Sequence, residues 1–300
     1  MSYNVSKDSN LLNYSKCNIC QSEDIDNFLK KNYWEFGYCR NCGIVFLKNI
    51  PSDEDIKNIY NNFYFKDGQK FPTEGFKLDN NPAYINAKKR LKIIREIGPE
   101  RGRLLDIGCG TGIFLKIASF FYESIGFDIS RCATELAVKN LGVKAICGTI
   151  FDIDFRSQLF DVITMWDVIE HLKDPNNYIE KVSQIIRPGG LLVLSTGNIK
   201  SLMFRIQKKN WHLLTPPQHL FYFSPQTISV LLKNHGFKII KISYNGQYTN
   251  VGYIVNKLKQ LHNKNKLIRL IDLIIKTTKI NSLNIYLNLY DVMTIYAKKI

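Results

Sequence analysis

Closely spaced glycines follow an acidic residue in the middle of the chain. The run DIGCGTG at residues 106–112 stands between a short apolar stretch and an amphipathic one, which predicts a strand, a tight turn and a helix. Glycines allow positive φ and a close approach of backbone to ligand, and the first N–H groups of the helix face the same cleft. A dinucleotide fold needs a further glycine at 113 or 115, where Ile113 and Leu115 stand. Unless the turn merely joins strand to helix, it predicts a nucleotide-like ligand without a pyrophosphate.

A second acidic residue supports this interpretation. Asp128 follows the apolar run 123–127 and lies 20 residues after Gly108, where a carboxylate at a strand tip accepts hydrogen bonds from both hydroxyls of a ribose. S-adenosylmethionine (SAM) carries a ribose but no pyrophosphate, and the ammonium group of its amino-acid tail needs an acceptor. Asp106 stands where it can organise that tail, directly or through water. The two aspartates and the glycine spacing therefore predict a SAM site.

Two cysteine pairs near the N-terminus have the spacing of a zinc ribbon. Cys17-x2-Cys20 and Cys39-x2-Cys42 are separated by 18 residues, so that two tight turns can bring four thiolates into a tetrahedron. Four protein ligands leave no open coordination position, which predicts a structural Zn²⁺ and not a catalytic one. Unligated cysteines or a redox pair are the alternatives. The remaining cysteines lack partners at ligand spacing and are expected to pack in the interior: Cys109, Cys132 and Cys147.

Three side chains are candidates for the chemistry of methyl transfer. This reaction is an in-line displacement, and a general base is needed only when the acceptor holds its proton tightly, as a hydroxyl or a ketone α-carbon does. His219 lies in a proline-stiffened loop next to Tyr222 and is the preferred base, while His171 follows the expected fourth strand. Either histidine could instead make structural hydrogen bonds, and His171 could orient the cofactor. His212, near the same loop, is expected to line the acceptor pocket.

The elements that must position these residues follow the rhythm of a parallel α/β sheet. From residue 103 onward, short apolar runs alternate with amphipathic helices. Ser224-Pro225 favours a helix start, because serine caps the N-terminus and proline suits the first turn. The expected strands are 103–107, 123–127, 143–147, 160–165, 190–196, 237–244 and 290–297. The expected helices are 112–120, 131–140, 175–187 and 224–234.

The chain divides into three parts. Residues 1–50 form a zinc-ribbon-like module after a polar tail, and residues 51–100 form a helical connector. In the connector, residues 51–54 resemble a helix start and Tyr84–Ile97 has apolar spacing near 3.6. Residues 101–300 form the SAM-binding domain, with a basic helical insertion at about 251–280.

Positive charge is concentrated in the last third of the chain. The formal net charge is +15, and residues 201–300 contain 15 Lys and Arg but only 2 Asp and Glu. An electrostatic partner is therefore expected to meet this part, although the amino-acid bias of an AT-rich genome would give the same excess. No export signal or uninterrupted apolar run of membrane-spanning length stands out, so that a cytoplasmic location is expected.

The segment 251–279 alternates lysines with aliphatic residues. Basic amphipathic helices of this kind can lie on anionic membrane surfaces, so that peripheral contact with the inner membrane surface is one possibility and would fit a lipid-linked or quinone-like acceptor. The alternative is a helical insertion that covers the sheet edge or the acceptor site, with its lysines solvated.

Four segments, in this order, resemble class I SAM-dependent methyltransferases: LLDIGCGTGIFL, GFDIS, FDVITMWDVIEHLKDP and IIRPGGLLVLST. The resemblance covers roughly residues 100–245 and implies a Rossmann-like seven-stranded sheet whose last strand is antiparallel. It implies that Asp128 holds the ribose and that Ile129 and Ile150 flank the adenine. The implied cofactor-binding set is Asp106, Gly108, Cys109, Gly110, Gly112, Asp128, Ile129, Thr149, Ile150, Trp166 and Asp167. Many members have an acidic residue where Thr149 stands, with Asp152 nearby in this chain.

The cysteine region resembles the zinc-bearing N-terminal extension of one methyltransferase subgroup, through YWEFGYCRNCGIVFL and PSDEDIKNIYNNFYF. That subgroup includes sugar C-methyltransferases acting on nucleotide-linked sugars and many small-molecule enzymes. The resemblance implies a small-molecule acceptor such as a sugar nucleotide or another glycan- or lipid-linked metabolite.

Two other functions stay open. An RNA methyltransferase could use the zinc ribbon and the basic third, but residues 1–80, which contain the ribbon, have a net charge of −1 and the positive charge lies at the far end of the chain, which argues against nucleic acid. A non-catalytic SAM-binding or zinc scaffold protein would keep Asp106 and Asp128 and lack turnover. The sequence does not indicate an oligomeric state.

Overall fold

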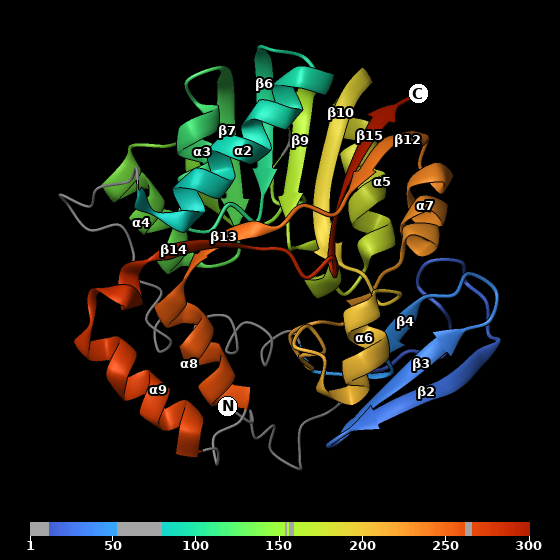
Figure 1. Cartoon of the computed structure of the whole chain (residues 1–300). Helices are drawn as coiled ribbons and strands as arrows, with labels where there is room; N and C mark the ends of the chain where they lie inside the picture. The colour runs from blue at the N-terminus through green and yellow to red at the C-terminus, as the bar shows by residue number, and fades with distance from the viewer. Residues whose placement is uncertain (1–11, 53–79, 154, 156–158, 262–265) are drawn as a thin grey trace.

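A computed structural model describes residues 12–52, 80–153, 155, 159–261 and 266–300 (Figure 1). Of the expected helical connector, residues 53–79 lie outside the described residues, as does most of the polar tail. The connector's second half is the helix α2 (Pro82–Ile97), whose N-terminus is capped by the side chain of Asn81.

A seven-stranded sheet forms the centre of the molecule, in the order β12-β15-β10-β9-β6-β7-β8. The last strand, β15, pairs antiparallel with both of its neighbours, whereas the pairs among β10, β9, β6, β7 and β8 are parallel. The α/β fold with an antiparallel last strand is therefore confirmed. The strands are β6 (Gly102–Ile107), β7 (Tyr122–Asp128), β8 (Ala145–Cys147), β9 (Phe160–Trp166), β10 (Ile186–Gly197), β12 (Phe237–Ser243) and β15 (Val292–Lys299).

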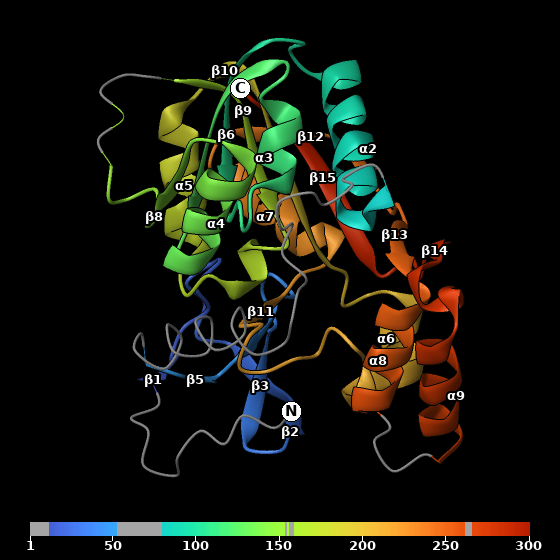
Figure 2. The ribbon, with the colours of Figure 1, turned by 90° about the vertical axis from the view of Figure 1, so that its left-hand side faces the viewer.

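Helices cover both faces of this sheet, because successive strand residues alternate between two apolar clusters. Leu104 and Val193 pack with α2 and α3, whereas the adjoining Leu105 and Leu192 pack with α5 and α7 (Figure 2). The helices are α3 (Ile113–Ala118), α4 (Arg131–Leu141), α5 (Pro175–Ile185) and α7 (Pro225–Asn234). The helix expected at 175–187 ends at Ile185, because a proline at 188 disfavours helical backbone at the residue before it.

The cysteine region forms a second, smaller sheet below the first (Figure 1). Its order is β11-β4-β3-β2, so that a strand from residues 221–222 completes a sheet begun before residue 50. The N-terminal module is thus joined to the methyltransferase domain by main-chain pairing. The strands are β2 (Ile25–Lys31), β3 (Trp34–Cys39), β4 (Val45–Leu47) and β11 (Phe221–Tyr222), beside the short pair β1 (Leu12–Asn13) and β5 (Asn49–Ile50).

A helical insertion separates β12 from β15. Its two ends, β13 and β14, pair antiparallel, and Asn86 of α2 fixes them by exchanging two hydrogen bonds with the backbone of Tyr248. No helix among the described residues is long and apolar enough to cross a membrane. The insertion comprises β13 (Gln247–Asn250), α8 (Val251–Leu261), α9 (Lys266–Thr277), η4 (Lys279–Ser282) and β14 (Asn284–Leu287). Three short helices remain, η2 (Ile169–His171), α6 (Leu202–Gln207) and η3 (Lys208–Asn210).

Candidate active site

The glycine turn lies at the carboxyl end of β6, and its conformation requires glycine. Gly108, Gly110 and Gly112 have φ values of 75°, 53° and 79°. A Cβ on Gly108 would lie 2.3 Å from Cγ2 of Val168, and one on Gly112 would lie 2.8 Å from Cβ of Ala137. The spacing in the sequence therefore corresponds to a backbone that no other residue can adopt here without strain.

Asp128 joins the tip of β7 to this turn. Its carboxylate accepts hydrogen bonds from the N–H groups of Gly110, at 2.8 Å, and of Ser130, at 2.9 Å. The side chain is buried, and burial raises the pKa of the carboxyl. The structure thus brings together the two parts of the motif that predicted SAM.

Asp106 is almost fully buried below the same turn. Thr164 Oγ1 donates a hydrogen bond to Asp106 Oδ1 at 2.6 Å. Burial raises the pKa of Asp106 to about 7, against the lowering effect of the Thr164 hydrogen bond and the Arg90 charge. The carboxyl is therefore costly to ionise in the free protein, and a cation at this place would favour its charged form.

Arg90 is a site residue that no sequence motif indicated. It projects from α2, with its guanidinium carbon 4.3 Å from the ring centroid of Trp166 and its Nη2 atom 3.7 Å from Asp167 Oδ2. Its sequence position carries a weak signal, because Ala87 and Ile94, three residues before and four after it, are both buried. A cation on the buried face of an amphipathic helix indicates a charged partner inside the molecule.

The other predicted cofactor residues lie near the same edge of the sheet. Ile150 is fully buried and Ile129 is partly exposed. Both the N–H and the hydroxyl of Thr149 donate to Asp152 Oδ2, at 2.6 and 2.8 Å, which brings a carboxylate to the adenine corner. Cys109 is buried against Gly126. A Cβ atom on Gly126 would lie only 2.7 Å from the Cβ atom of Cys109.

The two cysteine knuckles have the same hydrogen-bond pattern. In each, the N–H of the residue after the second cysteine donates to the carbonyl of the first cysteine, at 2.8 Å in both cases. These residues are Gln21 and Gly43, with φ values of 60° and 79°. Two such turns, facing one another, direct four thiols to one point.

The four sulfur atoms are spaced for a metal. Cys17 and Cys42 have their Sγ atoms 3.6 Å apart, Cys20 and Cys39 3.5 Å apart, and all four lie within 4.8 Å of one another. A tetrahedral Zn²⁺ with Zn–S distances of about 2.3 Å needs sulfurs about 3.8 Å apart. The four cysteines are therefore compatible with a closed, structural zinc site.

His171, His219 and Tyr222 come together across the cleft from the glycine turn. The rings of His171 and His219 are 4.6 Å apart between centroids, and Tyr222 Oη donates to the carbonyl of His219 at 3.0 Å. His171 Nδ1 lies 2.8 Å from the carbonyl oxygen of Gln218. The three residues predicted for catalysis thus form one cluster, although a catalytic role stays a prediction.

Tyr222 and the neighbouring Glu170 are buried, whereas His171 and His219 are half-buried. Burial lowers the pKa of His171 and lowers that of His219 well below its usual value. The neighbouring Glu170 has its pKa raised to about 8 by burial and by the charge of Asp167. Ligand atoms of Glu170, His171 and His219 lie within 4.8 Å of one another, close enough to share one polar group or one cation.

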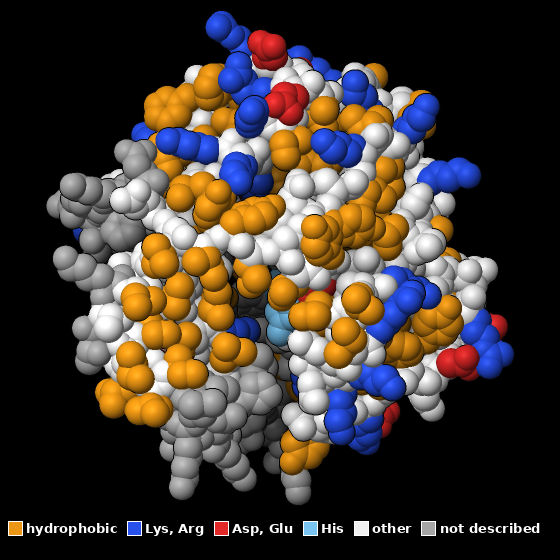
Figure 3. Space-filling model, in the orientation of Figure 1, with side chains coloured by type: hydrophobic (Ala, Val, Ile, Leu, Met, Phe, Trp, Pro, Cys, Tyr) orange, Lys and Arg blue, Asp and Glu red, His pale blue; other side chains and the backbone are white. Residues whose placement is uncertain are grey.

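The zinc module contacts the loop that carries His219, and the insertion places a positive charge near it. Phe221 pairs with Phe46 of β4, and Lys31 Nζ donates to the carbonyl of Leu214 at 2.6 Å. From the other side, the charge of Lys257 on α8 contributes to lowering the pKa of His219. Figure 3 shows a hollow between the sheet domain and the two groups of helices, with a histidine visible inside it.

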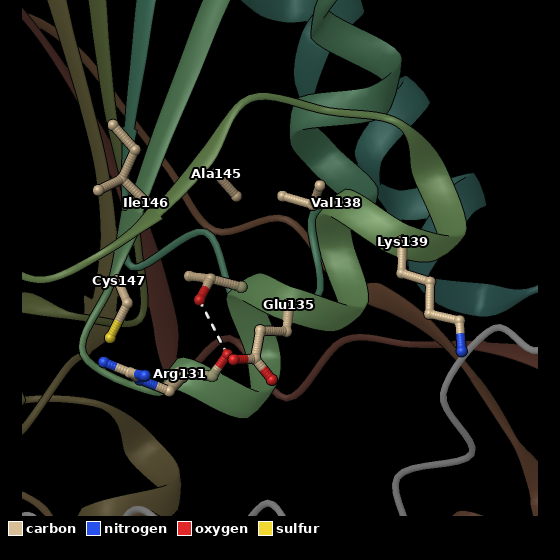
Figure 4. A pocket seen from close by; sticks show the side chains of 8 residues that line it. Arg131, Glu135, Val138, Lys139, Ala145, Ile146 and Cys147 are labelled. Carbon is tan, nitrogen blue, oxygen red and sulfur yellow. Dashed lines mark hydrogen bonds between the residues drawn. The ribbon is translucent and has the colours of Figure 1, made fainter.

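A separate groove lies between α4 and β8, outside this cleft (Figure 4). Its lining includes Arg131, Glu135 and Cys147, and Thr134 Oγ1 donates to the carbonyl of Arg131 at 2.9 Å. None of its lining residues belongs to the glycine turn or to the histidine cluster. The cofactor is therefore not assigned to this groove.

The sheet order, the glycine turn and Asp128 at the next strand tip define a SAM-dependent methyltransferase of class I. A family model described as a methyltransferase domain matches residues 81–242, more than half of the chain, and the chain belongs to this family. It is an enzyme that uses SAM, as the sequence predicted.

Curated relatives have related names. The chain is 26% identical over 175 residues to the ubiquinone biosynthesis O-methyltransferase of Coxiella burnetii, covering 54% of this chain and 75% of the relative. The protein of the same name from Aromatoleum aromaticum is 28% identical over 196 residues, covering 57% of this chain and 84% of the relative.

Solved structures share the fold. Magnesium protoporphyrin IX methyltransferase from Synechocystis PCC 6803, solved with bound SAH, has a TM-score of 0.53, 15% identity, and coverage of 83% of this chain and 100% of that chain. A SAM-dependent methyltransferase from Thermotoga maritima, described as a possible histamine N-methyltransferase, has a TM-score of 0.52, 19% identity, and coverage of 82% and 100%.

Proposed function

We propose that this protein transfers the methyl group of SAM to a hydroxyl of a small, apolar, phenolic acceptor, with His219 as the general base. The observation that carries the proposal is the position of His219. It is half-buried, burial keeps its pKa low, and its ring centroid lies 4.6 Å from that of His171, in a loop that is hydrogen-bonded to η2 just after the carboxyl end of β9. A neutral imidazole at such a place can accept a proton at neutral pH.

The cofactor side is supported by charge and by shape. When bound, SAM supplies a methyl group on a positively charged sulfur. Asp128 would hold the ribose hydroxyls, and Asp106 would accept from the ammonium group. Arg90, which lies over Trp166, would pair with the carboxylate of the methionine part. Ile129 and Ile150 would flank the adenine, with Thr149 and Asp152 at its edge.

The acceptor side provides for the proton. As the acceptor oxygen forms its bond to the methyl carbon, the carbon–sulfur bond breaks and its electron pair stays on sulfur. His219 takes the hydroxyl proton. The backbone of Leu213 favours the protonated form of this ring, which assists the transfer of that proton. Tyr222 holds the backbone of His219 in place through its hydroxyl.

An apolar phenolic acceptor fits this environment better than a sugar nucleotide. Trp211, Leu214 and Leu220, which flank the loop, are buried apolar side chains. The relatives named for ubiquinone biosynthesis are O-methyltransferases by name, which favours a quinone-like or lipid-linked acceptor. The zinc module would have no chemical part and would hold the loop through β11.

The test is transfer of labelled methyl from SAM to separate acceptor fractions: prenylated phenols, nucleotide sugars and RNA. We expect base-stable label on the phenol fraction, as an aryl methyl ether. Label on nucleotide sugars or on RNA, with none on phenols, would contradict the proposal. Label that survives intact in His219→Ala would contradict the role of His219 alone.

A further inference from the structure

Helix α9 buries its one acidic residue and presents aliphatic side chains to the solvent. Its acidic residue Asp272 is buried, with 6% of its surface exposed, and pairs with Lys259 of α8 at 2.6 Å. Leu270, Leu273 and Ile274 are 54%, 62% and 53% exposed. Among the described side chains of α9, the acidic one is buried and these aliphatic ones face outward, which indicates an apolar surrounding on that side.

A second helix on the other side of the hollow has the same character. Leu202 and Ile206 of α6 are four residues apart, which places them on one side of the helix, and they are 70% and 68% exposed. Lys208 and Lys209, which follow α6, are exposed as well. Apolar side chains bordered by lysines are the arrangement of helices that lie in a lipid interface.

These helices lie on one side of the molecule, around the mouth of the hollow. Figure 2 shows α6, α8 and α9 gathered below the central sheet at its right-hand side, and Figure 3 shows apolar side chains over both borders of the hollow. Tyr253 and Leu258 of α8 add exposed apolar surface to the same border.

The charge of this part of the chain selects the partner. Residues 201–300 contain 15 basic residues and two acidic ones, Asp272 and Asp291, and both acidic side chains are buried. An anionic surface would therefore meet no exposed acidic side chain from residues 201–300. RNA would satisfy the charge, but it would leave the aliphatic side chains of α6 and α9 in water.

We propose that α6, η3, α8 and α9 form a docking surface for an anionic lipid bilayer. The exposed aliphatic side chains enter the interface between headgroups and acyl chains, and the lysines contact the lipid phosphates. The hollow then opens toward the bilayer. That an apolar acceptor reaches His219 from the membrane rests on the proposed function, whereas lipid binding itself does not.

Flotation of the whole protein with vesicles tests the proposal without any acceptor. We expect the protein to float with vesicles of phosphatidylcholine and phosphatidylglycerol, and much less with phosphatidylcholine alone. Ile206→Glu with Leu273→Glu should weaken this binding at least tenfold, because both place a charge in the interface. SAM affinity of the variant, measured by calorimetry, should stay unchanged and so verify folding.

Two matched variants separate the contributions. Phe120→Glu makes the same kind of change at a residue that is 66% exposed and precedes the amino end of β7, at the end of the sheet away from α6, α8 and α9 (Figure 1), and this variant should bind vesicles normally. Lys208→Ala with Lys209→Ala should weaken binding about 30-fold, and the double arginine variant should retain it.

Three results would overturn the proposal. The first is absence of binding to anionic vesicles. The second is unchanged binding by the double glutamate variant. The third is a dimer that the double glutamate variant dissociates, or RNA that displaces the protein from vesicles and binds that variant normally, since either would identify another occupant. Because no acceptor is present, failure here leaves the transfer assay with prenylated phenols unaffected.

Discussion

The cofactor end and the acceptor end of the cleft are built in different ways. The cofactor end comes from neighbouring sequence, since Gly110 and Asp128 lie 18 residues apart and are joined by a hydrogen bond. The acceptor end combines η2, the loop before β11, the zinc module and α8, which are far apart in the chain. The cofactor site is thus local in the chain, whereas the proposed acceptor site is assembled from distant segments.

This difference indicates where specificity resides. The glycine turn allows few substitutions, because Cβ atoms at Gly108 and Gly112 would collide with Val168 and Ala137. The acceptor loop is fixed instead by separate modules, each of which can change without touching the cofactor. Damage to the acceptor end should therefore leave SAM binding intact.

Replacement of the proposed base should have the largest effect. His219→Ala should lower kcat for the phenolic acceptor by about 10²–10⁴-fold, since the hydroxyl proton loses its acceptor. Calorimetry should give an unchanged Kd for SAM. His235→Ala removes a histidine whose Nε2 lies 2.9 Å from Asn176 Oδ1, away from the cleft, and should keep full activity. Equal losses of SAM affinity and kcat in His219→Ala would contradict the separation of the two ends.

The pH dependence sharpens the same prediction. Burial places the pKa of His219 well below its usual value, so the basic form persists as the pH falls through the range in which an exposed histidine is protonated. We therefore expect kcat, measured with saturating SAM so that Asp106 is held in its charged form, to stay flat from pH 8 to about pH 6. A fall centred near the ordinary histidine pKa would show that another group is the base.

Loss of the zinc site should have the next largest effect on activity. Cys42→Ser should reduce bound zinc, which we expect near one ion per chain by elemental analysis, and should lower kcat/KM by about 10²-fold through disorder of the loop next to β11. SAM affinity should change less than threefold or so. Cys132→Ser, a change at a lone half-buried cysteine of α4, is the matched control. Normal methyl transfer by a zinc-free protein would show that the zinc module does not support the acceptor site.

Asp106 should give the smallest effect, on stability of the free protein. Its pKa in the folded state is about 7, above its unfolded value, so the folded state retains a proton that the unfolded state has lost, and stability falls as pH rises from about 4 to 7. Asp106→Asn should remove this penalty and stabilise the SAM-free protein by on the order of 2 kcal/mol at pH 8, but not at pH 4. Denaturant unfolding at both pH values checks this, and a variant equally stable or less stable at pH 8 would contradict it.

Features set by local spacing could be predicted from the sequence. The sheet, the glycine turn, Asp128 and the four cysteines all follow from short patterns whose geometry is fixed by neighbouring backbone. The start of the helix after Ser224 could also be predicted, and in the structure Ser224 and Thr227 form a reciprocal capping pair there.

Features that depend on distant contacts could not be predicted in this way. Arg90 carries no motif and gains its place only when α2 packs on the sheet beside Trp166. The pairing of β11 with β4 joins residues about 175 positions apart, and the sequence of a two-residue strand does not indicate which strand it pairs with. The aliphatic face of α9 points outward because Asp272 is buried in its pair with Lys259. Periodicity alone would place such a charged pair at the surface and the aliphatic face in the interior.

The most direct test of the account is calorimetric titration of SAM into the wild-type protein and Asp128→Ala. We expect the variant, folded and with its zinc retained, to bind SAM at least about tenfold more weakly. It loses the acceptor for the ribose hydroxyls and for the N–H of Gly110. An unchanged SAM affinity in that variant would contradict the assignment of the glycine turn and Asp128 as the cofactor site.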